Sequence, residues 1–152
     1  MQKITTFLTF KDRAEDAARF YVSLLPDSRI VDIVPGLDGE VLVVNFQLAG
    51  QDYIALNGGP SFAFSNAFSL MVTCEDQAEV DDLWARLTAD GGEEVACGWL
   101  KDRFGVSWQI TPRRMMELLV DPDPQRKRRA FTAMTEMVKL DIAALERAAD
   151  GA

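Results

Sequence analysis

The stretch ITTFLTFKDRAEDAARFYVSLL (residues 4–25) decides the fold, because its first part favours a strand and its second part a helix. Residues 4–10 consist of Ile, Thr, Phe and Leu, a run typical of a β-strand. The apolar residues that follow recur at helical spacing and form one stripe, made of Ala17, Phe20, Tyr21 and Leu24. We expect Asp12 to cap this helix, which then runs to Leu25 and stops before Pro26.

The same pattern occurs again in FSLMVTCEDQAEVDDLWARL (residues 68–87). Its helical part carries an apolar stripe made of Val80, Leu83, Trp84 and Leu87, and Gly91 and Gly92 are expected to end the helix. A shift of 64 residues aligns four identical pairs, which are Thr9 with Thr73, Asp12 with Asp76, Ala14 with Ala78 and Glu15 with Glu79. Two unrelated strand–helix units can share so short a match by chance, so the strands that follow decide whether this is a repeat.

Several strands and no second helix follow each predicted helix. In the first half we expect strands at residues 28–34, 40–48 and 52–57, separated by turn sequences. In the second half we expect two, at residues 93–99 and 106–111, unless Gly98 divides the first of them. The order is then β-α-β-β-β used twice. The sequence predicts an α+β fold of paired βαβββ modules that bury or enclose their uncovered sheet faces.

Alternation within two strands indicates what those faces carry. In the strand at residues 40–48, Leu42, Val44, Phe46 and Leu48 form a face suited to packing on the helix, and the other face carries Val41, Val43, Asn45 and Gln47. In the strand at residues 106–111, Val106, Trp108 and Ile110 alternate with Ser107, Gln109 and Thr111. Neutral hydrogen-bonding groups on a sheet face favour a partly enclosed cavity. The alternative is an ordinary exposed face of an antiparallel sheet.

Composition excludes several classes of function. The 152 residues are 48% hydrophobic, which suffices for a core, and the net charge of −8 opposes binding to nucleic acid or an anionic membrane. The sequence contains no apolar run long enough to span a bilayer, and its first residues do not read as a signal peptide. Cys74 and Cys97 are the only cysteines, as expected for free thiols in the cytoplasm.

The last forty or so residues form a helical tail. Asp123 is expected to cap one helix that starts at Pro124, and Asp141 a final one that carries Ile142 and Leu145. The first of these helices has apolar positions at Phe131, Met134 and Val138. The basic run of residues 126–129 is expected to be solvated or paired with acidic groups. The apolar stripes need a surface to cover, which predicts a homodimer; a stable monomer in sedimentation at micromolar concentration would contradict it.

Four segments resemble a known family, at residues 7–30, 50–60, 97–112 and 118–148. They are similar to the PhnB-like group, also labelled demethylubiquinone methyltransferase-like, of the vicinal-oxygen-chelate superfamily of glyoxalases, bleomycin-resistance proteins and dioxygenases. The resemblance implies one domain over residues 1–112, with modules at about 1–64 and 65–112, and a tail over 113–152. The methyltransferase label is not supported by the sequence, because no glycine-rich loop follows the first strand.

The resemblance also implies where a metal would bind in relatives, which use two histidines and carboxylates. This chain has no histidine, Gln109 stands at a ligand position of the second module and Ile54 at that of the first. An amide and an alkyl side chain compete poorly with water for a transition metal. We therefore expect no metal and no cofactor. No catalytic residue is assigned. Cys97 is the remaining candidate nucleophile, with Lys101 or Arg103 to lower its pKa, against the alternative of a structural cysteine.

These observations favour a module that binds or sequesters a small organic molecule in a cavity lined by aromatic and amide side chains. The predicted ligand-binding residues are Asn45, Asn57, Phe62, Phe64, Trp99, Ser107 and Gln109. Two alternatives stay open. The first is an enzyme that acts on a small molecule without a metal, through Cys97 or positioned hydrogen bonds. The second is a structural dimer without a working cavity.

Overall fold

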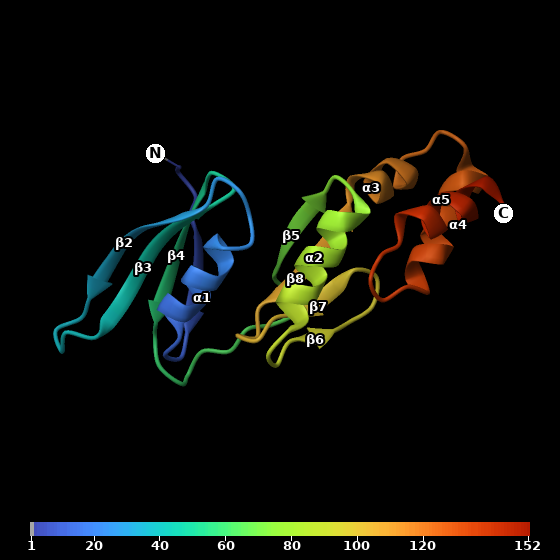
Figure 1. Ribbon diagram of the computed structural model, residues 1–152. Helices are drawn as coiled ribbons and strands as arrows, with labels where there is room; N and C mark the ends of the chain where they lie inside the picture. The colour runs from blue at the N-terminus through green and yellow to red at the C-terminus, as the bar shows by residue number, and fades with distance from the viewer. Residues whose placement is uncertain (1) are drawn as a thin grey trace. The chain divides into compact units, whose positions relative to one another are not determined.

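The computed structural model describes residues 2–152, which divide into two compact units. The first unit ends at Ala63, and the second runs from Phe64 to Ala152. Each unit contains a four-stranded mixed sheet with one helix between its first and second strands, which confirms the predicted α+β fold with two βαβββ modules (Figure 1). Within the described residues, no helix is long and apolar enough to cross a membrane.

The sheet of the first unit has the strand order β1-β4-β3-β2. Its elements are β1 (Thr6–Phe10), α1 (Ala14–Val22), β2 (Arg29–Pro35), β3 (Val41–Leu48) and β4 (Gln51–Asn57). β1 pairs with β4 in parallel, and the other pairs are antiparallel. α1 covers one face of this sheet, so each strand has a helix-facing side and an opposite side.

The core of the first unit lies between α1 and the middle of the sheet. Val44, Phe46 and Tyr21 are at most 1% exposed, and the rings of Tyr21 and Phe46 lie 6.5 Å apart. The predicted helix-facing side of β3 is therefore confirmed, except at Leu42, which is 41% exposed. Leu42 lies at the hairpin end of β3 and lines a surface pocket instead.

The prediction that Asp12 caps α1 is wrong. Arg13 occupies the N-cap position and makes no capping hydrogen bond with its side chain. The backbone N–H of Ala14 instead donates to Oδ1 of Asn57, at the end of β4, over 2.8 Å. A residue 43 positions away thus satisfies a free N–H group of the helix. The helix ends at Val22, three residues before the predicted end.

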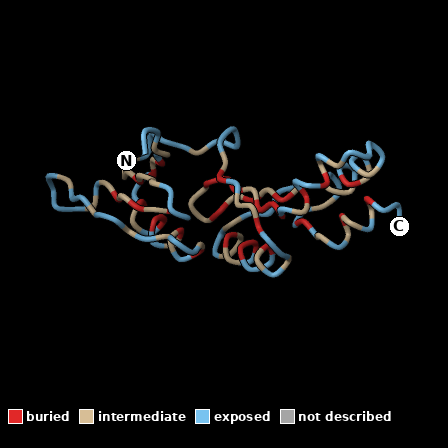
Figure 2. Tube along the Cα trace, turned by 90° about the horizontal axis from the view of Figure 1, so that it is seen from above, coloured by how far each residue is buried: buried red, intermediate tan, exposed pale blue. Residues whose placement is uncertain are grey.

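The sheet of the second unit has the strand order β5-β8-β7-β6, and β5 pairs with β8 in parallel. Its elements are β5 (Ser69–Cys74), α2 (Gln77–Thr88), β6 (Glu93–Glu94), β7 (Trp99–Lys101) and β8 (Ser107–Pro112). Asp76 caps α2 by accepting from the N–H of Glu79, and the Glu79 carboxylate accepts from the N–H of Glu75, the residue before the cap. The predicted apolar stripe of α2 is buried. Figure 2 shows where buried residues lie along the chain.

The run predicted as one strand at residues 93–99 is divided into β6 and β7. Cys97 and Gly98 adopt φ values of 60° and 83°, which interrupt the strand between β6 and β7. With β8, the second module therefore has three strands after its helix. The N–H groups of Cys97 and Gly98 donate to the carbonyls of Met137 and Val138, both over 2.8 Å. The tail is thereby attached to the backbone of the second sheet.

The tail folds onto the second unit as three helices, α3 (Arg113–Leu119), α4 (Pro124–Thr135) and α5 (Ile142–Asp150). α3 is not foreseen by the sequence analysis. The three helices share a small core of Met115, Leu118, Ala130, Leu140, Leu145 and Ala149. Asp123 and Asp141 cap α4 and α5 as predicted. Within the basic run, Arg126 bridges Asp121 and Asp150, and Arg129 donates to the carbonyl groups of Ala148 and Ala149. Val138 lies beyond the end of α4.

Candidate functional site

The uncovered face of the second sheet places several predicted ligand-binding residues side by side. Met71, Gln109 and Trp99 are register partners across β5, β8 and β7, and Ser69, Ser107 and Lys101 form the next row. Register partners lie on the same face, so these six residues form one surface, which we call the Gln109 face. The opposite face carries Leu70, Trp108 and Leu100, which are 1–9% exposed and lie on the α2 side.

The Gln109 face combines hydrogen-bonding groups with apolar ones. Nε2 of Gln109 donates to Oγ of Ser69 over 2.9 Å, and Oγ of Ser107 donates to Oδ1 of Asn66 over 3.2 Å. Within residues 2–152, Oε1 of Gln109 makes no hydrogen bond. Trp99 is half-buried and Met71 is 48% exposed. The surface can therefore accept a hydrogen bond while it contacts an apolar group.

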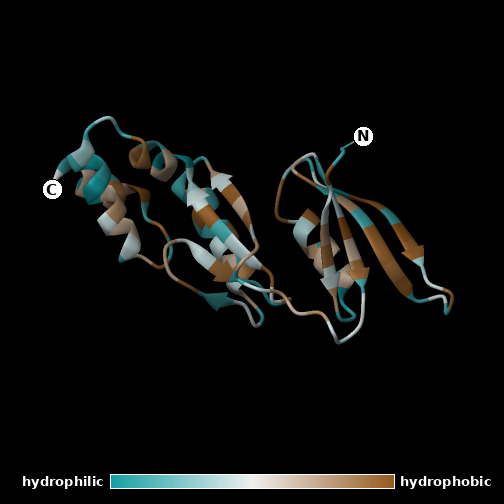
Figure 3. Cartoon of the chain, turned by 180° about the vertical axis from the view of Figure 1, so that it is seen from behind, coloured by the Kyte–Doolittle hydropathy of each residue, from teal (hydrophilic) through white to brown (hydrophobic). Residues whose placement is uncertain are grey.

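The first unit has a comparable surface around Asn45. Asn45 is a register partner of Ile54 on β4, which in turn pairs with Phe7 on β1. Its half-buried amide makes no hydrogen bond with any residue that the structure describes, and Phe7 is 53% exposed. Figure 3 shows hydrophobic segments, coloured brown, along the strands of this sheet near the N-terminus. A free amide beside apolar side chains is a second surface suited to an organic molecule.

Asn57 and Phe62 occupy a different place, at the end of β4. Both ends of the Asn57 amide serve the fold, because Oδ1 accepts from Ala14 and Nδ2 donates to the carbonyl of Val41 over 3.0 Å. Phe62 is 54% exposed and lies against Gly58. Phe64 is half-buried beside Gly105 in the second unit. The predicted ligand-binding residues thus fall into separate groups, of which the Gln109 face is the largest.

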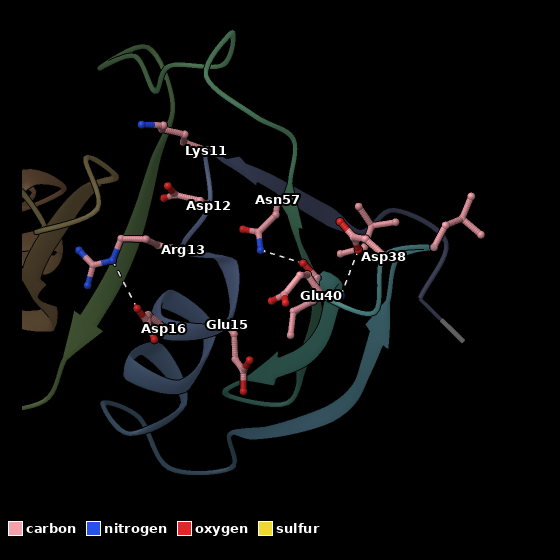
Figure 4. Close-up of a pocket in the computed structure, with 12 residues that line it drawn as sticks. Lys11, Asp12, Arg13, Glu15, Asp16, Asp38, Glu40 and Asn57 are labelled. Carbon is pink, nitrogen blue, oxygen red and sulfur yellow. Dashed lines mark hydrogen bonds and ion pairs between the residues drawn. The ribbon is translucent and has the colours of Figure 1, made fainter.

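A pocket of about 750 Å³ lies at the N-terminus of α1 in the first unit (Figure 4). It is lined by Lys11, Asp12, Arg13, Glu15, Asp16, Gly36, Leu37, Asp38, Glu40, Val41, Leu42 and Asn57. Its charged side chains are largely exposed, and Arg13 pairs with Asp16 over 3.4 Å. This pocket could not be predicted from the sequence, because three separate chain segments meet there. Charges in turns give no sequence signal of their own.

Asp102 is a buried charged residue at the end of β7. It is 2% exposed, and its Oδ1 accepts from the N–H groups of Phe104 and Val106 over 2.8 and 3.0 Å. Its Oδ2 accepts from Nε1 of Trp108 over 2.8 Å. The bond to a buried indole cannot be predicted from the sequence. This carboxylate holds the β7–β8 hairpin together.

Comparisons with known proteins agree with this architecture. The family model described as 3-demethylubiquinone-9 3-methyltransferase matches residues 2–111. The PhnB protein from Bacillus cereus is 37% identical, with a TM-score of 0.68, and the match covers 73% of this chain and 99% of that chain. The chain belongs to this PhnB-like family.

More distant solved structures share the fold of the PhnB-like family. A protein from Pseudomonas aeruginosa has a TM-score of 0.61 at 17% identity, covering 74% of this chain and 98% of that chain. A glyoxalase/bleomycin resistance protein from Albidiferax ferrireducens has a TM-score of 0.51 at 17% identity, covering 74% and 99%. These likenesses concern the fold alone. No curated protein matches it.

The donor set of this PhnB-like chain does not suit the metal that the superfamily implies. Among residues 2–152, no three His, Cys, Asp or Glu side chains come together in a way that could hold an ion. Gln109, at the position the resemblance gives to a ligand, uses its amide nitrogen to bind Ser69. Neutral amide and hydroxyl groups are weak ligands for transition metals. No step of a reaction is therefore assigned to a metal.

The two cysteines should differ in reactivity. Burial raises the pKa of the Cys74 thiol to about 12, with further contributions from the carboxylates of Glu79, Asp76 and Glu75, and the side chain is 0% exposed. Cys97 is half-buried. At about pH 8 we expect iodoacetamide to label Cys97 in the native protein and to leave Cys74 unlabelled, as peptide mass spectrometry can show. In Cys97→Ser, label should enter only after denaturation; equal native labelling of both thiols would contradict this.

Proposed function

We propose that the Gln109 face binds a small organic molecule and that the protein acts as a binding or sequestering module. The observation that carries this proposal is the juxtaposition of a hydrogen-bond acceptor, Oε1 of Gln109, with the apolar side chains of Trp99 and Met71. An aromatic side chain supplies contact area at low entropic cost, and the amide supplies orientation.

The Asn45 face supports the same proposal from the first unit. An unpaired amide that is half-buried costs free energy unless water or a ligand satisfies it. Its neighbours Ile54 and Phe7 are apolar, so a ligand that offers one polar atom and an apolar body matches this surface as well.

The proposed binding requires neither a metal nor S-adenosylmethionine. The segment between β1 and α1 reads KDR and contains no glycine, whereas a nucleotide-type cofactor loop needs glycine there for close backbone approach. We therefore propose that the methyltransferase description of the family does not state the chemistry of this chain. Turnover that depends on added S-adenosylmethionine would contradict this.

The binding proposal is tested by an NMR screen of small aromatic amides and alcohols against the isotope-labelled full chain. Bound probes should shift the side-chain signals of Gln109 and Trp99. Gln109→Ala should weaken the best probe roughly fivefold, the value of one hydrogen bond of about 1 kcal/mol.

The matched control is Gln125→Ala, an exposed amide in the first turn of α4, which should leave the affinity unchanged. Probes that shift neither Gln109 nor Trp99 at millimolar concentration would refute the proposal. Once a substrate is known, loss of turnover in Cys97→Ser would favour the enzyme alternative.

A further inference from the structure

Lys101 is a cation at one end of the Gln109 face. It shares its side of β7 with Trp99, because Leu100 between them is 1% exposed and belongs to the helix-facing side. Its register partner on β8 is Ser107, whose partner on β5 is Ser69. The positive charge therefore lies in the same row as two hydroxyl groups.

Lys101 differs from the other cations of this region, because no acidic side chain among residues 2–152 pairs with it. Arg86 pairs with Asp82 and Arg103 pairs with Asp90, the other cations between residues 64 and 112. Within residues 2–152, Lys101 forms no ion pair within 4.0 Å, although Glu93 is its register partner on β6. In a chain of net charge −8, this half-buried lysine is a cation that forms no ion pair, although the carboxylate of Glu93 on the neighbouring strand reduces the local positive charge.

Ser69 is a second hydrogen-bond donor on the same face as Lys101. Its oxygen accepts from Nε2 of Gln109, and its hydroxyl proton donates to no residue that the structure describes. Ser69 and Lys101 flank β8 at a backbone separation of roughly 10 Å, two strand spacings, which the long lysine side chain can partly span. Ser107, which lies between them on β8, is 4% exposed, and its hydroxyl donates to Asn66. A group that contacts both donors therefore lies beside Ser107, over Gln109.

We propose that the ligand of the Gln109 face carries an anionic oxygen group, such as a carboxylate, held by Lys101 and Ser69. Its apolar body lies against Trp99 and Met71, and Oε1 of Gln109 is the acceptor for any hydrogen-bond donor that this body carries. This inference rests on the proposed function and specifies the class of ligand. The class of ligand follows from the two rows of the Gln109 face. Lys101, Ser107 and Ser69 form one row, and Trp99, Gln109 and Met71 form the next.

The test compares 2-naphthoate with 2-naphthamide, its neutral analogue of the same shape, by calorimetry and by NMR on the full chain. The carboxylate should bind about tenfold more tightly than the amide, as expected for one charge-assisted hydrogen bond. Lys101→Met should bring the two affinities together. Glu93→Gln, which removes the nearest carboxylate in register, should tighten 2-naphthoate alone. Lys127→Met, an exposed cation of α4, should change neither.

The outcomes separate this inference from the proposed function. Equal affinities for both probes, with shifts at Trp99 and Gln109, would overturn the anionic class and leave the binding site in place. A preference for the carboxylate that survives Lys101→Met would likewise overturn the role of Lys101. Failure of both probes to shift Trp99 or Gln109 would overturn the proposed function and the inference together.

Discussion

Asp102→Asn is expected to lower the free energy of unfolding of the second unit by about 3 kcal/mol. This is the cost expected when a charge-assisted hydrogen bond is lost and a buried donor is left unsatisfied. The carboxylate accepts three N–H bonds, and an asparagine has one oxygen with which to accept. If that oxygen keeps the backbone donors of Phe104 and Val106, the new amide nitrogen faces Nε1 of Trp108, and two donors oppose each other in a buried place.

Urea unfolding followed by tryptophan fluorescence measures this change directly. All three tryptophans lie in the second unit, so the signal reports that unit. Asp82→Asn is the matched control, because Asp82 is an exposed partner of Arg86 and should cost less than about 1 kcal/mol. Equal unfolding midpoints for the two variants would show that the buried acceptor does not hold the hairpin.

Gly98→Ala is the second change with a large expected effect, about 3 kcal/mol, from a strained backbone and a steric conflict together. Gly98 has a φ of 83°, and a β-carbon there would lie 2.9 Å from Cδ1 of Leu140 and 3.0 Å from the carbonyl oxygen of Ile110. The backbone of β8 cannot move away without loss of its ladder. Leu140 and the tail must therefore shift.

Gly91→Ala separates the two contributions. Gly91 has a φ of 105° but open space where a β-carbon would lie, so its substitution carries only the backbone cost of about 1 kcal/mol. Hydrogen exchange at Cys97 and Gly98, whose N–H groups bind the tail carbonyls, should accelerate in Gly98→Ala and not in Gly91→Ala. Unchanged exchange at both amides in Gly98→Ala would contradict the attachment of the tail at this point.

Features of the fold that depend on neighbouring residues could be predicted from the sequence. Asp123 and Asp141 cap the helices that directly follow them, and the apolar stripe of α2 repeats at helical spacing. The cap of α1 could not be predicted, because its acceptor is Asn57 on a strand that becomes adjacent only when the sheet forms. The division of the run at residues 93–99 was left open, since it depends on the tail that binds Cys97 and Gly98.

In the candidate site, too, features within one strand could be predicted from the sequence, whereas contacts between strands could not. Alternation along β8 placed Gln109 opposite the buried Trp108, and that assignment is confirmed. Its neighbours Met71 and Lys101 come from other strands, and their position follows from register alone. Asn57 was assigned to ligand binding from its residue type, whereas its two hydrogen bonds hold α1 and β3 in place. Whether it also contacts a ligand stays a prediction.

The most direct test of ligand binding at the Gln109 face is the location of bound 2-naphthoate by intermolecular nuclear Overhauser effects. We predict contacts from the naphthyl protons to the Met71 methyl group and the Trp99 indole. Contacts to Leu37 and Leu42 in the charged pocket of the first unit, with none to Met71 or Trp99, would contradict the assignment.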